Sequence, residues 1–176
     1  MKTFSTSLAE IFSLNEFYGE NNPKNLADLS DYIGEGLVTI RAVDIPDVEF
    51  DLRHFSQFSG GGAHQEYCAR AAKWLESIGK TWSARDLDYA GGVADVMATD
   101  RGIAVECGYT QSGKVIDALA NGMQVLVFPY ASDGVGFLFK AKRKKELQRR
   151  TIKKDWSVVI DRRLFPRVPY TRRLGK

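Results

Sequence analysis

Apolar and polar residues recur along the first half of this chain at spacings that predict both helices and strands. Five apolar positions near the N-terminus repeat at helical spacing: Leu8, Ile11, Phe12, Leu14 and Phe17. Residues 23–34 predict a second short helix closed by Gly34, and residues 37–43 (LVTIRAV) predict a strand. Beyond three consecutive glycines, residues 63–78 predict a helix whose apolar side carries Tyr67, Ala71, Trp74, Leu75 and Ile78.

The second half predicts a sheet. A strand is expected over residues 81–88 and a turn over 90–92. Two strands around residues 93–98 and 103–106 then flank the turn 100–102, which predicts an antiparallel hairpin. A helix over 112–121 ends at Gly122, and a strand follows over 124–129. The stretch GVGFLFKAKRKKELQRR predicts a strand or turn that leads into a basic helix.

This order predicts an α/β fold in which helices flank a mixed central β-sheet. A helical N-terminal segment precedes the sheet, and a basic C-terminal extension follows it. The chain has 176 residues, enough for one domain with a real core but short for two. We therefore expect a single α/β domain over residues 1–137, with its core at about 62–130, and an extension over 138–176.

Two acidic residues stand inside the predicted hairpin. Asp95 interrupts the apolar run of residues 93–98, and Glu106 ends the run of residues 103–105. An unpaired ionised carboxylate in an apolar setting costs several kcal/mol. Two acids on adjacent strands repel each other, and a divalent cation removes that conflict. The pattern predicts a Mg²⁺ site, or Mn²⁺ in its place, and with it phosphodiester chemistry.

The order of elements and the two acids resemble the PD-(D/E)XK nuclease superfamily, whose core is restriction-endonuclease-like. The layout AHQEYCARAAKWL, followed by GGVADV and IAVEC, is also similar to the nuclease-type domain of CoiA-like competence proteins. The resemblance covers roughly residues 62–130. It implies that Asp95 and Glu106 bind the metal and that His64 or Glu66, from the first helix, completes the site.

The chain departs from the motif at one position. Two residues after Glu106, where the superfamily places a lysine, stands Gly108. Members of the superfamily recruit a lysine from the next helix, which implies Lys114, with Thr110 and Gln111 as polar alternatives. A second interpretation is a P-loop, because residues 108–114 (GYTQSGK) have its glycine and lysine spacing; Val115 then replaces the hydroxyl residue that holds Mg²⁺.

Purely structural roles compete with each of these assignments. Asp95 could pair with Arg101 or Arg85, and Glu106 with Lys114. Glu66 is spaced for ion pairs with Arg70 or Lys73 on one helix face, and His64 could be an exposed residue of the first helical turn.

The two cysteines also have structural interpretations. Cys107 reads as a small core residue. His64 and Cys68 have i, i+4 spacing suited to Zn²⁺, but the sequence offers no second Cys/His pair, which argues against a zinc site.

Charge is distributed unevenly along the chain. Residues 138–176 carry 15 Lys/Arg and 3 Asp/Glu, a net charge of +12, whereas residues 1–137 carry −9. This asymmetry predicts a polyanionic partner, nucleic acid and most simply DNA, bound through backbone phosphates. The residues expected to make those contacts are Lys140, Lys142, Arg143, Lys144, Lys145, Arg149, Arg150, Lys153 and Lys154.

The sequence favours a metal-dependent nuclease that hydrolyses DNA, most simply an endodeoxyribonuclease. A homodimer would let two copies cut both strands. The alternatives are a catalytically inactive nucleic-acid-binding or regulatory protein on the same fold, and a protein-interaction or inhibitor protein. Two cysteines on different elements predict no disulfide framework, no apolar run reaches membrane-spanning length, and a cytoplasmic location is expected without a membrane partner.

Overall fold

A computed structural model describes residue 11 and residues 22–49, 58, 60–89, 92–108, 110–130 and 132–150. The side chains of residues 22–27 and 85–89 lie outside this description. So do most of the first predicted helix, of which only Ile11 is described, the turn at residues 90–91, and residues 151–176 with Lys153 and Lys154.

A six-stranded mixed sheet forms the centre of the described part, in the order β1-β6-β5-β4-β3-β2. Strands β4 and β5 run parallel, and the other neighbouring pairs run antiparallel. The strands are β1 (Val38–Asp44), β2 (Trp82–Tyr89), β3 (Gly92–Ala98), β4 (Ile103–Cys107), β5 (Gln124–Phe128) and β6 (Val135–Ala141). The predicted α/β class with a mixed sheet is confirmed.

The segment from residue 62 to residue 128 follows the predicted order of helix, three strands, helix and strand. Its helices are α4 (Gly62–Ser77) and α5 (Ser112–Ala120). The hairpin β3–β4 forms as expected, and its turn holds Arg101 at a φ of 57°, a left-handed conformation that a tight hairpin turn requires. Ile78 was predicted on the buried side of the helix over residues 63–78. It is exposed, because α4 ends at Ser77.

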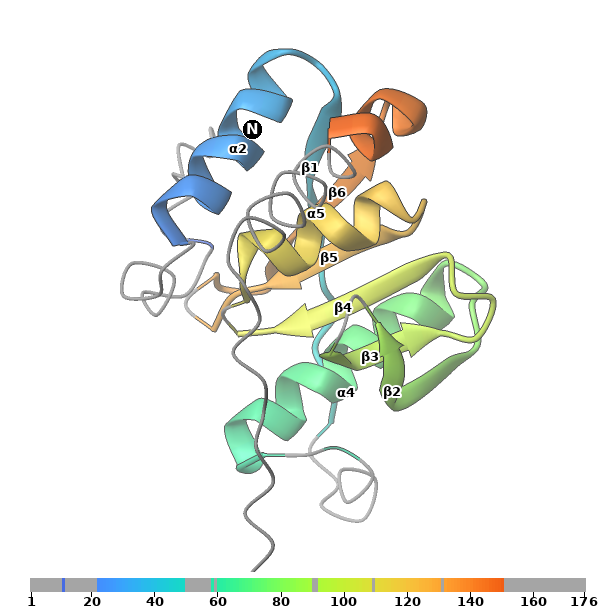
Figure 1. The fold of residues 1–176 in the computed structure, drawn as a ribbon. Coiled ribbons are helices and arrows are strands. Elements are labelled where there is room, and N and C mark those ends of the chain that lie inside the picture. The colour runs from blue at the N-terminus through green and yellow to red at the C-terminus, as the bar shows by residue number, and fades with distance from the viewer. Residues whose placement is uncertain are drawn as a thin grey trace, which may run out of the picture.

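Helices cover both faces of the sheet (Figure 1). Helix α2 (Asn22–Gly34) and α5 lie on one face, where Leu29, Leu119 and Phe139 share a buried apolar cluster. Helix α4 covers the other face, where Leu75 and Phe128 belong to a second cluster. Successive residues of a strand belong to different clusters: Ala104 lies in the cluster with Leu119, and Val105 lies in the cluster with Leu75.

Strand β6 sets where the basic segment begins. The expected start of the extension, residue 138, lies inside this strand, where Leu138 is buried and aligned with Leu126 of β5. Because β6 runs antiparallel to β5, residues 142–150 leave the sheet at the edge opposite the carboxyl ends of β4 and β5 (Figure 1). Residues 144–150 are helical, as predicted.

Candidate functional site

Four of the predicted site residues meet at one edge of the sheet. Helix α5 connects the parallel strands β4 and β5, so it begins beside the carboxyl end of β4. That connection brings Lys114, in the first turn of α5, next to Glu106. On the other face, the first turn of α4 places His64 against Asp95 of β3.

Lys114 is tied to Glu106 and to the backbone of β3. Its Nζ lies 2.8 Å from Glu106 Oε1 and donates hydrogen bonds to Glu106 Oε2 at 2.9 Å and to the Val93 carbonyl at 2.8 Å. A lysine in the first turn of a helix opposes the helix dipole, so its position has to be favoured from outside the helix. The Glu106 carboxylate supplies that attraction.

Glu106 is the most buried acid of the described part, with 8% of its side chain exposed. The pKa of this carboxyl is raised from 4.5 to about 7, chiefly by burial and to a smaller extent by the nearby Asp95 charge. Lys114 and the Thr110 hydroxyl, 3.3 Å from Oε2, act in the opposite direction. Glu106 Oε1 is buried and has no hydrogen-bond donor, although the Lys114 ammonium contacts it.

The raised pKa of Glu106 makes stability depend on pH in metal-free protein. The unfolded carboxyl ionises near 4.5 and the folded one near 7, so wild-type stability is expected to fall as the pH rises across that window. Glu106→Gln has no proton to lose. The free energy of unfolding of the variant, relative to wild type, should therefore rise by about 1.4 kcal/mol per unit of pKa difference across the window. Chemical denaturation at a series of pH values measures this change, and two parallel pH profiles would contradict it.

Asp95 is held from two sides. Its Oδ2 accepts a hydrogen bond from the backbone N–H of Cys107 at 2.8 Å, and its Oδ1 lies 3.3 Å from His64 Nε2. The first contact crosses from β3 to β4 and fixes the carboxylate beside Glu106. An arginine pair was the competing interpretation; the described contacts of Asp95 are instead a backbone amide and a histidine.

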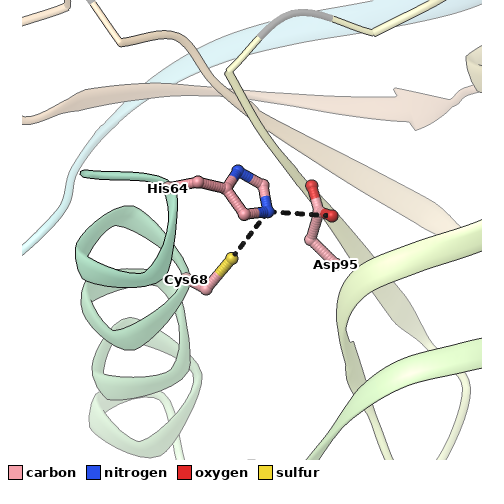
Figure 2. Close-up of side chains that lie close together, drawn as sticks. All are labelled: His64, Cys68 and Asp95. Carbon is pink, nitrogen blue, oxygen red and sulfur yellow. Dashed lines mark hydrogen bonds and ion pairs between the residues drawn. The ribbon is translucent and has the colours of Figure 1, made fainter. Parts of the chain in front are cut away.

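His64 contacts three side chains, of which Cys68 and Asp95 are drawn in Figure 2. Its Nε2 lies 3.3 Å from Asp95 Oδ1 and 3.4 Å from Cys68 Sγ, while its Nδ1 shares a hydrogen bond of 2.7 Å with the Tyr130 hydroxyl. Tyr67 in turn donates a hydrogen bond to the Tyr130 carbonyl. His64 is thus a fixed, half-buried residue, and the interpretation as a freely exposed side chain does not hold.

Glu66 lies on a different side of α4 from His64. Residues that are two positions apart in an α-helix are rotated by about 200° around its axis, so the side chains of Glu66 and His64 point in nearly opposite directions. Its expected ion-pair partners are also engaged elsewhere, since Arg70 contacts Asp47 at 2.8 Å and Lys73 contacts Glu76 at 3.4 Å. Of the two first-helix candidates, His64 is the one that reaches the site.

Gly108 occupies a position that a lysine cannot share. Its φ is +90°, and a Cβ there would lie 2.5 Å from the Tyr130 ring. The backbone turns sharply after β4, and the tyrosine ring fills the space beside it. The lysine therefore reaches Glu106 from α5. The lysine of the P-loop interpretation is thus the one that pairs with Glu106.

Cysteine positions agree with core packing. Cys68 and Cys107 are both buried and free, and their thiols interact with each other. Burial raises the pKa of the Cys107 thiol, which opposes the thiolate form that a nucleophile needs. Sequence reasoning missed Cys68 and Tyr130 as neighbours of the acids. The i, i+4 spacing of His64 and Cys68 was a usable signal, whereas Tyr130 is 66 residues away from its partner.

The basic surface lies away from this site. Lys144 packs against Gly122 beyond the end of α5, whereas Lys114 stands at the start of that helix. A helix of nine residues is about 13 Å long, which separates the two lysines. Two of the predicted phosphate-binding residues already have acidic partners: Arg150 pairs with Glu35, and Arg143 pairs with Glu146 at 3.1 Å. The other described residues of this group are Lys140, Lys142, Lys144, Lys145 and Arg149, and all five are exposed.

Comparisons with known proteins identify no relative. The chain matches no protein-family model, no curated protein and no solved structure. Among the helices in the described ranges, none has the length and apolar character needed to cross a membrane.

Proposed function

We propose that this protein is a metal-dependent nuclease of the PD-(D/E)XK type that hydrolyses phosphodiester bonds in DNA. One observation carries the proposal. The Lys114 ammonium sits 2.8 Å from the buried Glu106 carboxylate, beside Asp95, at the point where two strands and two helices converge. This chemistry uses two acids and a lysine; here Lys114 contacts Glu106, and the Asp95 charge acts on the Glu106 carboxyl.

The acids fit a Mg²⁺ or Mn²⁺ ion. Both are carboxylates, which supply the hard oxygen ligands these cations prefer, and Glu106 Oε1 makes no hydrogen bond, although the Lys114 ammonium lies 2.8 Å from it. Mutual repulsion between the two acids helps to keep the pKa of Glu106 high, a conflict that a cation relieves. When bound, such an ion polarises the phosphate and lowers the pKa of a coordinated water.

The residues of the chain have distinct roles in this proposal. Asp95 and Glu106 bind the ion, and the backbone amide of Cys107 keeps Asp95 oriented. Lys114 stabilises the negative charge that develops on the phosphate, because its ammonium is already positioned at the carboxylate. His64 contacts Asp95 Oδ1 through its Nε2 and so helps to hold that carboxylate in place.

Metal-dependent cleavage of circular DNA tests the proposal. Wild-type protein is incubated with single- and double-stranded circles in Mg²⁺, in Mn²⁺ and in EDTA, beside the Glu106→Gln variant. We expect cleavage with either metal, none in EDTA, and a loss of about three orders of magnitude in the variant. Cleavage that persists in EDTA, or that Glu106→Gln leaves intact, would overturn the proposal.

The exposed basic residues are proposed to contact DNA phosphates outside the cleavage site. Neutralising Lys140, Lys142, Lys145 and Arg149 together should weaken binding of every DNA sequence alike. The slope of log affinity against log salt should fall by up to about 0.9 per lost phosphate contact. Fluorescence anisotropy at several salt concentrations measures this slope. Neutralising Lys73 and Lys80, which are ion-paired on other surfaces, is the matched control and should leave the slope unchanged.

A second candidate function is non-catalytic nucleic-acid binding on the same fold. Gly108, which cannot carry the motif lysine, is the observation that favours it. The two candidates differ in one result. Tight, salt-sensitive DNA binding without cleavage in either metal would favour the non-catalytic binding protein. The third hypothesis, a protein that binds another protein through its first 35 residues, concerns a segment that lies mostly outside the described residues.

A further inference from the structure

Three side chains beside the acids have the composition of a transition-metal site. The ligand atoms of His64, Cys68 and Asp95 all lie within 4.8 Å of one another. An imidazole, a thiol and a carboxylate suit Zn²⁺, whereas Mg²⁺ avoids sulphur and takes oxygen. This set is chemically different from the pair of carboxylates described above, although Asp95 belongs to both.

Two of the three distances between the ligand atoms match the edges of a tetrahedron around zinc, and the third, from Cys68 Sγ to the Asp95 carboxylate, is at most 4.8 Å. With Zn–N near 2.0 Å, Zn–O near 2.0–2.2 Å and Zn–S near 2.3 Å, tetrahedral ligand atoms stand about 3.3–3.6 Å apart. His64 Nε2 lies 3.3 Å from Asp95 Oδ1 and 3.4 Å from Cys68 Sγ (Figure 2). Both neighbours share the same ring nitrogen. In a Cys-His-Asp nucleophilic triad they would contact opposite nitrogens.

A hydrogen-bonded arrangement serves these atoms less well. Without an ion, an N–H on His64 Nε2 faces an oxygen at 3.3 Å and a sulphur at 3.4 Å, and it can donate well to only one of them. The oxygen contact is longer than usual for a hydrogen bond. A divalent cation satisfies all three ligand atoms at once and neutralises the Asp95 charge.

The other side of the imidazole is arranged as in metal-binding histidines. Such residues donate the second ring N–H to a fixed acceptor, which sets the tautomer and aims the free nitrogen at the metal. The Tyr130 hydroxyl lies 2.7 Å from His64 Nδ1, and Tyr67 holds Tyr130 through its carbonyl. His64 and Asp95 keep 18% and 22% of their side chains exposed, so an ion can enter from solvent.

We propose that His64 Nε2, Cys68 Sγ and Asp95 Oδ1 bind one Zn²⁺ ion. The three described ligands leave the fourth tetrahedral position to a water or to an oxygen of a bound molecule, as in catalytic zinc sites. The site ties the first turns of α4 to β3. It does not depend on nuclease activity, because its ligands bind the ion whether or not DNA is cleaved.

Cobalt titration of the full-length, metal-free protein tests this proposal, since Co²⁺ replaces Zn²⁺ and reports its ligands optically. We expect one equivalent of Co²⁺ to bind with a sulphur-to-cobalt charge-transfer band and tetrahedral visible bands. Zn²⁺ should abolish both, and excess Mg²⁺ should leave both unchanged. The absence of the charge-transfer band in wild type would overturn the proposal. DNA cleavage does not enter this readout, so its failure and that of the nuclease proposal are distinguishable.

Two variants identify the sulphur. Cys68→Ser should lose the charge-transfer band, whereas Cys107→Ser, which removes the neighbouring buried thiol, should retain it. The reverse pattern would overturn the assignment.

Tyr130→Phe provides a measurement that keeps every ligand in place. It should weaken Zn²⁺ binding about 10- to 100-fold in competition with a chromophoric chelator. Unchanged affinity would contradict the role given to the His64–Tyr130 contact.

Discussion

Replacing Lys114 with methionine is expected to lower metal-dependent DNA cleavage about 100- to 1,000-fold and to destabilise the protein by about 3 kcal/mol. The ammonium is the main positive neighbour of a carboxylate that is 8% exposed, and its loss leaves Glu106 with the Thr110 hydroxyl as its remaining described side-chain donor. Methionine preserves the length and apolar stem of the side chain. Single-turnover cleavage and chemical denaturation measure the two effects.

The stability effect should depend on pH with a defined sign. Loss of Lys114 raises the pKa of Glu106 above its value of about 7. The destabilisation should therefore be larger above pH 7, where wild-type Glu106 is ionised, than below pH 4.5, where the carboxyl is protonated in both proteins and in the unfolded chain. Lys73→Met removes an ion pair with 61% of the lysine exposed, and it should cost less than about 1 kcal/mol. Equal losses in the two variants would contradict a buried Lys114–Glu106 pair.

Restoring the motif lysine with Gly108→Lys is expected to destabilise the protein by several kcal/mol and to leave cleavage below the wild-type rate. A left-handed φ of +90° is strained for any residue with a Cβ, and that Cβ would lie 2.5 Å from Tyr130. Gly108→Ala isolates the backbone and Cβ contribution. In Gly108→Ala combined with Tyr130→Ala, the clash is gone and the conformational strain remains.

Thermal unfolding and cleavage of these variants test whether Lys114 performs the role of the motif lysine. If Lys114 has taken over the role of the motif lysine, an extra lysine at residue 108 adds strain and no activity. Cleavage that rises above wild type in Gly108→Lys, with unchanged stability, would contradict the assignment of that role to Lys114.

The local pattern of the sequence was sufficient to predict most elements and the pairing of Glu106 with Lys114. A helix that links two parallel strands must start where the first strand ends, so the first turn of α5 was bound to lie beside Glu106. The same logic does not extend to the neighbours of Asp95. Cys68 and Tyr130 reach His64 through the packing of α4 on the sheet and through the loop after β5, which no local spacing encodes.

The basic segment shows a second limit of sequence reasoning. Charge composition predicted a polyanion-binding surface, and that prediction remains untested. Charge composition does not show on which side of the molecule a basic segment lies, however. Because β6 runs antiparallel to β5, residues 142–150 begin at the end of the sheet opposite Asp95 and Glu106. Arg150 moreover stacks on Tyr32 and pairs with Glu35, so a residue counted for its charge also anchors α2.

The measurement that tests the nuclease proposal most directly is single-turnover cleavage of double-stranded DNA in Mg²⁺ by the matched variants Asp95→Asn and Asp100→Asn. Both substitutions remove one carboxylate charge, but Asp100 lies in the hairpin turn and pairs with Lys80. We predict that Asp95→Asn loses at least about three orders of magnitude in rate while Asp100→Asn stays close to wild type. Equal rates in the two variants would contradict a catalytic site at Asp95 and Glu106.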